Sequence, residues 1–432
     1  MLQLFGSGLL SLWLDQANVQ PWVPGTLINW WERTWVVDIP DPEAEIIVQQ
    51  YLQRLSDSGL DKWNQGIWLQ SGNRSVFNHQ GTVPLSAASI TKIATSLAAL
   101  VTWGPEYQFE TWLGVTGPIE NGVLQGDLVV QGRGDPFFGW EAAIALGNSL
   151  QQAGINRVTG NLVITGNFAM NFELDPLTAG ELLRQGLNAQ LWPTATLGQH
   201  AALPAGTPQP EVIIEGAVQS QPLATITGQV SQPIVRHPSS PLVNILKGMN
   251  VYSNNVMADI LAHNLGGAEV VAQRAAQLAR VPAEEIRLIN GSGLGAENQI
   301  SPRAAVAMLM AIQRYCRPYG MNVTDLFPIS GQDIGTLIDR QVPPSATVKT
   351  GTLWNVSALA GVLPTRNRGL VWFAILNGGT GIENLRSQQD ILLQALVQHW
   401  GAASPIPSAL QPEAQTDQSR SRLRAASRGY AF

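Results

Sequence analysis

The chain is poor in charged residues and nearly lacks cysteine. Only 13% of its 432 residues are charged, whereas 45% are hydrophobic, so most of the chain has the apolar side chains that a folded core requires. The net charge of -6 and the lack of a basic stripe argue against nucleic acid as a partner. The single cysteine, Cys316, excludes an internal disulfide and a Cys/His zinc site, and we expect a buried thiol there.

Several enzyme signatures are absent as well. The sequence contains no Walker A loop, no Gly-x-Gly-x-x-Gly fingerprint after a strand, and no Gly-x-Ser-x-Gly elbow of the kind that Ser-His-Asp hydrolases use. The five histidines are not clustered, and we interpret them as structural. These absences predict neither a metal ion nor any other cofactor.

The first 32 residues lack the basic start that export signals normally have. Residues 1–14 are largely apolar, but the first basic residue is Arg33. This apolar run is too short to predict a membrane span, which leaves an atypical export signal, an interfacial anchor or a buried element. We favour export or anchoring, with peripheral membrane contact through the N-terminus.

The apolar periodicity predicts a sheet with helices packed on it, interrupted by an insertion. Helices are expected after Asp41-Pro42, from Ser89, after Ser301-Pro302 and over residues 384–400. Strands are expected over residues 66–70 and 75–77, from residue 348, and over residues 357–362 and 370–376. The predicted division is an apolar N-terminal segment (1–32), a discontinuous main domain (33–107 and 235–402), a β-rich inserted domain (108–234) and a disordered tail (403–432).

Lysine is scarce and supplies only four of the 25 basic residues. Arginine is permanently charged, whereas a desolvated lysine can be neutral and act as a base. Ser89-Ile90-Thr91-Lys92 opens a predicted helix, and residues three apart share a helix face, so the Lys92 amine can reach the Ser89 hydroxyl. This pattern favours a serine nucleophile with a lysine base, although a helix cap followed by a surface lysine would look the same.

A second lysine lies in Lys349-Thr350-Gly351-Thr352, on a predicted strand. Lysine and threonine suit the binding of a carboxylate, and Gly351 would let a substrate backbone come close; a strand-edge lysine beside a turn is the alternative. Between the two motifs lies Ser253-Asn254-Asn255, where a serine could relay a proton and an asparagine could hold a peptide amide. The order Ser-x-x-Lys, Ser-x-Asn, Lys-Thr-Gly is the signature set of serine penicillin-binding proteins and β-lactamases.

With these motifs the chain resembles the class C low-molecular-mass penicillin-binding proteins, the D-alanyl-D-alanine carboxypeptidase/endopeptidase family. The resemblance spans about residues 40–400, and a large domain inserted between the first two motifs is a trait of that family. Further stretches similar to the family are residues 124–128, 134–136, 241–247 and 291–294.

The resemblance implies an α+β fold of the serine β-lactamase/penicillin-binding transpeptidase type, an antiparallel sheet packed by helices, with an inserted β-rich domain. It implies a serine D-Ala-D-Ala carboxypeptidase that acts on peptidoglycan peptides through an acyl-enzyme and is inhibited by β-lactams. Endopeptidase activity remains open beside it. An enzyme of this kind is exported and lies in the periplasm or at the cell envelope.

The family's site residues carry over by position. Ser89 is then the acylated nucleophile and Lys92 its base. Ser253 helps to protonate the leaving amine, and Asn255 binds the substrate amide. The terminal carboxylate is held by Lys349 and Thr350, and the backbone N–H groups of Ser89 and Thr352 form the oxyanion hole.

Two positions depart from the family pattern. Gly295-Ala296 stand where relatives often have serine and arginine, and Thr165-Gly166 stand where an aspartate is common. In the family that the chain resembles, both regions help to recognise a diaminopimelate-type side chain, so we expect a weaker preference for it here. A class A β-lactamase is disfavoured because no Glu-x-x-x-Asn spacing occurs between Lys92 and Ser253. The alternatives are a non-catalytic module that binds wall peptides, and an esterase or amidase on the same fold.

Overall fold

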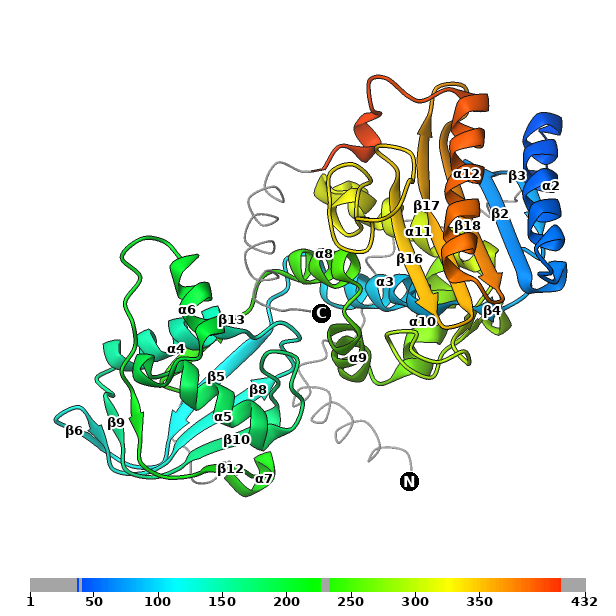
Figure 1. Cartoon of the computed structure of the whole chain (residues 1–432). Coiled ribbons are helices and arrows are strands. Elements are labelled where there is room, and N and C mark those ends of the chain that lie inside the picture. Colours follow the sequence, from blue (N-terminus) through cyan, green and yellow to red (C-terminus); the bar gives the residue numbers. More distant parts are fainter. Residues whose placement is uncertain (1–36, 39–40, 227–232, 413–432) are drawn as a thin grey trace, which may run out of the picture. The chain divides into compact units, whose positions relative to one another are not determined.

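The computed structural model describes residues 37–38, 41–226 and 233–412 (Figure 1). The predicted export signal or anchor, residues 1–32, lies outside the described residues, and so does the last part of the predicted tail, residues 413–432. Within the described ranges, no helix combines the length and the hydropathy that crossing a membrane requires.

The largest sheet joins strands from both ends of the described chain. Five of its strands follow the order β3-β2-β18-β17-β16, and each pairs antiparallel with its neighbour. Every residue of β17 is buried, which is why this strand is largely apolar. The strands are β2 (Gln65–Ser71), β3 (Arg74–His79), β16 (Thr347–Leu353), β17 (Val356–Thr365) and β18 (Gly369–Gly378), and the described chain begins with β1 (Val37–Asp38).

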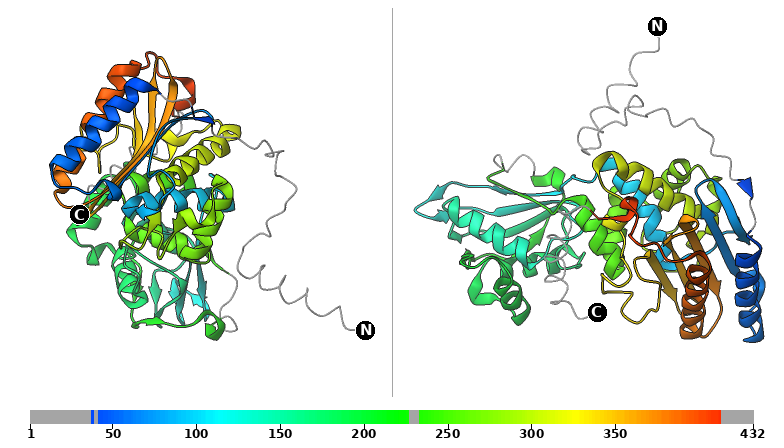
Figure 2. Two further views of the ribbon diagram at one scale, coloured as in Figure 1. Left: turned by 90° about the vertical axis from the view of Figure 1, so that its right-hand side faces the viewer. Right: turned by 90° about the horizontal axis from the view of Figure 1, so that it is seen from above.

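Two helices cover one face of this sheet. As predicted, α2 (Pro42–Asp57) begins directly after its cap, Asp41. The last helix, α12 (Ile382–Trp400), packs beside α2, and Figure 2 shows both on the same side of the sheet. Alternate residues of β2, among them Ile67 and Leu69, point into the core between these helices and the sheet.

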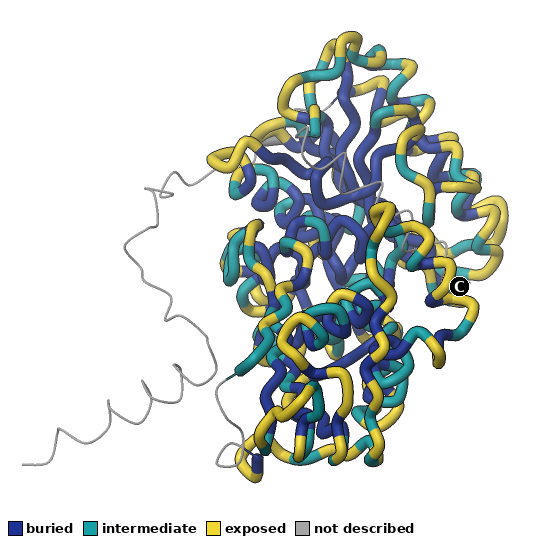
Figure 3. The backbone as a smooth tube through the Cα atoms, turned by 90° about the vertical axis from the view of Figure 1, so that its left-hand side faces the viewer, coloured by how far each residue is buried: buried dark blue, intermediate teal, exposed yellow. Residues whose placement is uncertain are grey.

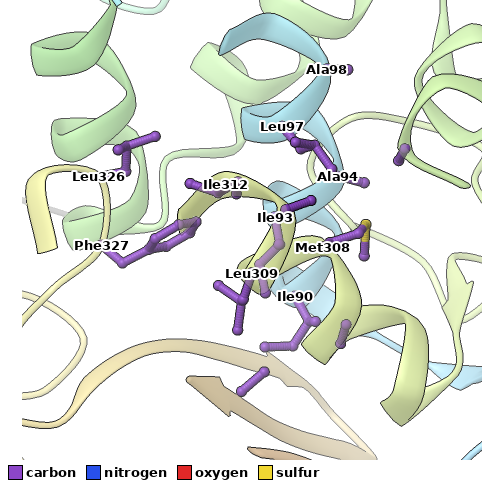
Figure 4. Close-up of a cluster of buried hydrophobic side chains, with 14 of the residues drawn as sticks. Ile90, Ile93, Ala94, Leu97, Ala98, Met308, Leu309, Ile312, Leu326 and Phe327 are labelled. Carbon is purple, nitrogen blue, oxygen red and sulfur yellow. The ribbon is translucent and has the colours of Figure 1, made fainter. Parts of the chain in front are cut away.

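The opposite face packs against a group of helices around α3 (Thr91–Trp103). The first ten residues of α3 are all buried, and Figure 3 shows buried backbone running through the sheet and these helices. Figure 4 shows Ile93 of α3 beside Leu309 and Ile312 of α11 in one apolar cluster. The other helices of this group are α8 (Leu242–Tyr252), α9 (Asn255–Asn264), α10 (Ala268–Ala279) and α11 (Pro302–Cys316).

Cys316 ends α11 and is buried, as predicted. Burial raises the pKa of its thiol to about 12, so the thiolate that reactive cysteines need does not form near neutral pH. A small sheet of order β14-β15-β4 includes the strand that directly precedes the Ser89 motif in the sequence. Its strands are β4 (Leu85–Ser86), β14 (Ile286–Arg287) and β15 (Gln299–Ile300).

The segment between residues 108 and 234 contains the expected strands, together with helices that the sequence analysis did not predict. Its strands form a five-stranded sheet together with β13, which follows the segment directly; the order is β12-β10-β8-β5-β13, and β8, β10 and β12 pair in parallel. Parallel neighbours need crossover connections, and helices supply them here. The strands of this sheet are β5 (Glu110–Val115), β8 (Leu128–Arg133), β10 (Leu162–Asn167), β12 (Val218–Ser220) and β13 (Val235–Pro238).

The helices of this segment include one with a readable start signal. Asp175 caps α5 (Pro176–Gly186) by accepting a hydrogen bond from Thr178 N, as Asp41 does for α2, so this helix could have been predicted. The other helices are α4 (Trp140–Gln152), α6 (Thr194–Ala201) and α7 (Leu223–Ile226). A second, four-stranded sheet contains β6 (Ile119–Glu120), β7 (Val123–Leu124), β9 (Arg157–Val158) and β11 (Ile213–Ile214).

The prediction of a disordered tail from residue 403 is wrong for residues 403–412. This stretch contains a 3₁₀ helix, Ser408–Leu410, and Leu410 is only 3% exposed in the core around α3 and α11. The Ala409 carbonyl accepts a hydrogen bond from Gln313 of α11 at 2.9 Å. The polar composition hid two apolar contacts with this core, from Leu410 and the partly buried Ile406, and these contacts order the short segment together with its hydrogen bonds.

Candidate active site

Ser89 lies at the entry to α3 and is half-buried. It belongs to a 3₁₀ helix, Ala88–Ile90, which leads directly into α3, so the α-helix begins two residues later than predicted. Ala88 has a φ of 45°, which is uncommon for a residue with a side chain. A Cβ on Gly293 would lie 1.8 Å from the Ala88 carbonyl oxygen, so only glycine fits at that point of the facing loop.

Lys92 is fully buried and lies within hydrogen-bond distance of three oxygens. Its Nζ is 3.0 Å from Ser89 Oγ, 2.8 Å from Asn255 Oδ1 and 2.8 Å from the Ser292 carbonyl oxygen. Burial lowers the pKa of Lys92 to about 7, against an opposing effect of the Asp259 charge. A substantial fraction of the amine is therefore neutral near pH 7, which is the state a general base requires.

The Ser253-Asn254-Asn255 motif forms the junction between α8 and α9. Ser253 ends α8 in the left-handed conformation, with φ 55° and ψ 36°. The Asn254 side chain accepts a hydrogen bond from Met257 N and so caps α9, which makes Asn255 the first residue of that helix. This sharp reversal brings Asn255 to Lys92 and leaves Ser253 to Lys349.

Lys349 lies on the edge strand β16 and is fully buried. Its Nζ donates to Ser253 Oγ at 3.0 Å and to the Thr350 carbonyl oxygen at 2.7 Å. Burial, and to a lesser degree the nearby charge of Lys92, lower the pKa of Lys349 well below its usual range. The structure thus brings the three motifs together. Ser89 and Lys92 come from the entry to α3, Ser253 and Asn255 from the α8–α9 junction, and Lys349 from β16.

Gly351 touches the nucleophile segment rather than standing free for a ligand. A Cβ on Gly351 would lie 2.8 Å from the Ala87 carbonyl oxygen and 3.1 Å from Ser89 N. The expectation was that this glycine admits a substrate backbone. Its nearest neighbour in the structure is the chain's own backbone, so glycine is needed here for β16 and residues 87–89 to pack closely.

The two threonines that flank Gly351 each contact a residue that the sequence analysis did not single out. Thr350 is 7% exposed, and its hydroxyl is 2.8 Å from that of Thr336. Thr352 is exposed, and its Oγ1 accepts a hydrogen bond of 3.0 Å from Nη2 of Arg386 on α12. Neither partner has a local sequence signal, because each is brought to β16 only by the tertiary fold.

The loop of residues 291–294 supplies backbone to the site. The Gly291 carbonyl accepts from Thr95 of α3 at 2.8 Å, and Gly291 N donates to Asp259 of α9 at 3.0 Å. These bonds hold the Ser292 carbonyl, which accepts from Lys92. The stretch was noted in the sequence for its resemblance, but a role played by a main-chain oxygen leaves no signature in residue types.

Both departures from the family pattern fall at glycines with a positive φ. Gly295 has a φ of 112° and Gly166 a φ of 68°, and a Cβ on Gly166 would lie 2.4 Å from the Gly132 carbonyl oxygen. A larger side chain at either glycine would require a different backbone. Thr165, beside Gly166, is 2% exposed. Over the part of the chain that the structure describes, no group of three His, Cys, Asp or Glu side chains is placed to hold a metal ion.

The sequence matches the profile of the D-Ala-D-Ala carboxypeptidase 3 (S13) family over residues 48–173 and 211–398. The chain therefore belongs to this family. It is 24% identical to D-alanyl-D-alanine carboxypeptidase DacB of Haemophilus influenzae, over 74% of this chain and 87% of that protein. It is 26% identical to a carboxypeptidase of Mycobacterium tuberculosis, over 73% of this chain and 75% of that protein.

Solved structures share the fold. The chain is similar to the penicillin G-acylated predatory endopeptidase Bd3459 of Bdellovibrio bacteriovorus, with a TM-score of 0.66 and 22% identity over 79% of this chain and 96% of that one. The predicted α+β penicillin-binding fold is confirmed, and family membership confirms the predicted enzyme class, a serine-type D-Ala-D-Ala carboxypeptidase.

Proposed function

We propose that the chain removes the terminal D-alanine of peptidoglycan peptides through an acyl-enzyme on Ser89. The observation that carries this proposal is the 3.0 Å distance between Lys92 Nζ and Ser89 Oγ, together with a pKa of Lys92 near 7. A neutral amine has two N–H donors and one lone pair. When Asn255 and Ser292 accept the two donors, the lone pair is left to receive the proton of Ser89.

Acylation then proceeds with a defined route for each proton. Ser89 Oγ attacks the carbonyl carbon of the penultimate residue while its proton passes to Lys92. The backbone N–H groups of Ser89 and Thr352 stabilise the oxyanion. The C–N bond breaks as the leaving nitrogen takes a proton from Ser253, which recovers one from Lys349 at 3.0 Å.

Deacylation reverses these transfers. Water attacks the acyl carbon and its proton returns to Lys349 through Ser253, while Lys92 gives its proton back to Ser89. Before the C–N bond breaks, Asn255 holds the substrate amide, and Lys349 with Thr350 holds the terminal carboxylate, whose negative charge favours the protonated form of Lys349. The net reaction consumes one water and releases D-alanine.

The likeness to relatives extends the proposal to ligands and location. A penicillin G-acylated structural relative and the family's substrate class support peptidoglycan peptides as substrates and β-lactams as covalent inhibitors of this chain. Action on wall peptides supports export to the periplasm or the cell envelope, with residues 1–32 as signal or anchor. We also propose an inserted domain over residues 108–234, to whose sheet the next strand, β13, is added by pairing with β5.

The decisive experiment is intact-mass measurement after exposure to penicillin, followed by assay of D-alanine release from a cell-wall pentapeptide. The wild type should gain one penicillin per chain and release D-alanine, and Ser89→Ala should do neither while its circular dichroism is unchanged. An adduct on a peptide that lacks Ser89 would contradict the assignment. Labelling without D-alanine release would instead favour a non-catalytic wall-peptide module or an esterase.

Substrate choice is a separate part of the proposal. Gly295-Ala296 and Thr165-Gly166 offer no charged side chain to a diaminopimelate residue, whose ammonium and carboxylate would be left without those partners. We expect kcat/KM to favour diaminopimelate over a neutral replacement by much less than about a hundredfold, which is about 2.7 kcal/mol. A preference of that size or larger would contradict this expectation.

A further inference from the structure

Thr352 carries the one exposed hydroxyl of the Lys349–Thr352 motif, and a positively charged side chain, Arg386, donates a hydrogen bond to it. Residues two apart on a strand point to the same face, so Thr352 shares a face with Thr350 on the two sides of Gly351. Gly351 in turn packs against Ser89. The Thr352 hydroxyl is therefore next to the proposed carboxylate-binding residues and open to a ligand.

The hydrogen bond from Arg386 decides which way the Thr352 hydroxyl can donate. A threonine hydroxyl has one proton and two lone pairs. Arg386 Nη2–H occupies a lone pair of Thr352 Oγ1 at 3.0 Å, and a guanidinium carries no lone pair that could accept in return. The hydroxyl proton must therefore point away from Arg386 and remains available to an acceptor on the exposed side of Thr352.

Charge acts in the same direction. The Arg386 side chain is 32% exposed, and its Nη1 donates to Glu383, one turn earlier on α12 and 83% exposed, at 2.8 Å. The positive charge of Arg386 attracts a substrate carboxylate that binds to the Thr352 hydroxyl. The exposed Glu383 partner holds the guanidinium in place and weakens that attraction.

A second arginine, Arg340, forms a buried ion pair with α12 and serves as a comparison for Arg386. Arg340 binds Asp390 of α12 with both side chains about 95% buried, at 5% and 6% exposure, and donates from both Nε and Nη2. Within the described residues, the Arg386 guanidinium instead donates to an exposed glutamate, Glu383, and to the Thr352 hydroxyl. Arg340 therefore anchors α12 through a buried ion pair, and the exposed Arg386–Thr352 contact is available for another role.

We propose that Arg386 is a positioning residue for the substrate's terminal carboxylate: it fixes the Thr352 hydroxyl as a donor and adds positive charge beside it. This inference rests on the proposed function, because it assigns a determinant of specificity to the same reaction. It predicts that the enzyme distinguishes a free C-terminal carboxylate from an amide partly through a side chain on the last helix.

The test compares two peptides that differ only in a free or amidated C-terminal D-alanine. Arg386→Met should lower kcat/KM for the free acid about tenfold, mostly through KM, and change it less than about twofold for the amide. Arg386→Lys should recover part of the loss because it keeps a charged donor. The matched control is Arg184→Met, which removes another i,i+3 arginine–glutamate pair, on α5, and should leave both substrates unaffected.

A double-mutant cycle separates positioning from general damage. In the Thr352→Val background, Arg386→Met should have a clearly smaller effect on the free acid than in the wild type, because the hydroxyl it orients is gone and only its charge remains to be lost. Equal losses on both peptides, or full additivity with Thr352→Val, would overturn the inference while D-alanine release by the wild type keeps the proposed function. Absence of D-alanine release by the wild type would overturn the proposed function itself. Thermal melting of each variant shows whether a loss is caused by misfolding.

Discussion

Lys92 and Lys247 are both buried, at 0% and 3% exposure, in two regions of the same helical group. At the start of α3, the groups that accept from Lys92 are a hydroxyl, an amide and a carbonyl, all neutral. On α8, Lys247 Nζ donates to the Thr324 and Phe327 carbonyls and forms an ion pair with Asp333 at 2.8 Å.

The comparison shows that a buried lysine can either stabilise the fold as part of an ion pair or have a lowered pKa that suits a base. Taking an ammonium out of water costs several kcal/mol unless a countercharge compensates. Lys247 has that countercharge, and its bonds tie α8 to the loop that carries Thr336 toward β16. Lys92 has only the more distant Asp259 charge, so its pKa falls to about 7 and the amine becomes available as a base.

The largest expected effect is on catalysis at Lys92. Lys92→Met should lower kcat/KM for a D-Ala-D-Ala peptide by about 10³–10⁴-fold, because the base for Ser89 is removed. The melting temperature should not fall, since methionine fills a similar volume without a buried amine. Activity within tenfold of the wild type would show that another group takes the proton of Ser89.

The mirror experiment concerns Lys247 and stability. Lys247→Met should lower the free energy of unfolding by about 3–5 kcal/mol, because it leaves the buried Asp333 carboxylate without the ammonium that compensates its charge. The double variant Lys247→Met/Asp333→Asn should recover part of this loss in urea denaturation. If Lys247→Met were as stable as the wild type, the ion pair would not be the structural counterpart of the Lys92 site.

An intermediate effect is expected at Lys349, whose Nζ lies beside Ser253 and is proposed to bind the terminal carboxylate. Lys349→Ala should weaken a substrate with a free carboxylate by about 1.5–3 kcal/mol more than its amidated analogue. Measured kcat/KM values for the two peptides give this difference directly. Equal losses would assign Lys349 to proton transfer alone.

The smallest expected effect is a pH dependence set by Lys92. Because the base must be neutral, kcat/KM should fall by about tenfold per pH unit below a pKa of about 7. The folded pKa lies below the ordinary 10.5, so the unfolded chain binds more protons between about pH 7 and 10.5, and stability from this group rises with pH in that window.

Urea denaturation at several pH values checks the stability part of this prediction. The contribution of Lys92 has a slope of at most about 1.4 kcal/mol per pH unit, and Lys92→Met should remove it from the profile. An unchanged slope in that variant would show that Lys92 titrates alike in the folded and unfolded chain.

Much of the fold was readable because it depends on local signals. Asp41 and Ser301 mark the starts of α2 and α11, and apolar runs gave the strands β16 to β18. The helices between residues 108 and 234 were missed, although the Asp175 cap was visible, because short apolar runs do not distinguish a strand from a buried helix. Leu410 was missed because burial of one residue leaves no periodic pattern.

The candidate site divides in the same way. The motif residues have a recognisable order, so Ser89, Lys92 and Lys349 could be named in advance. The Ser292 carbonyl could not, because it acts through backbone. Arg386 could not, because 34 positions separate it from Thr352 and only the packing of α12 on the sheet joins them.

The pairing of β2 with β18 also has a consequence for the order of events on the ribosome. Gln65 of β2 and Asn377 of β18 are hydrogen-bonded although 312 positions apart, so the central sheet cannot close until nearly the whole chain has been synthesised. The strands between residues 108 and 234 find their partners much earlier along the chain.

We therefore expect the inserted segment to fold first during translation, while the Ser89 segment waits for β16. Nascent chains stalled before residue 340 should protect the inserted segment from protease and should not react with penicillin. Penicillin labelling at that length would contradict this order. Ser89 would thus stay unreactive until β16, the strand that packs against it, has been synthesised.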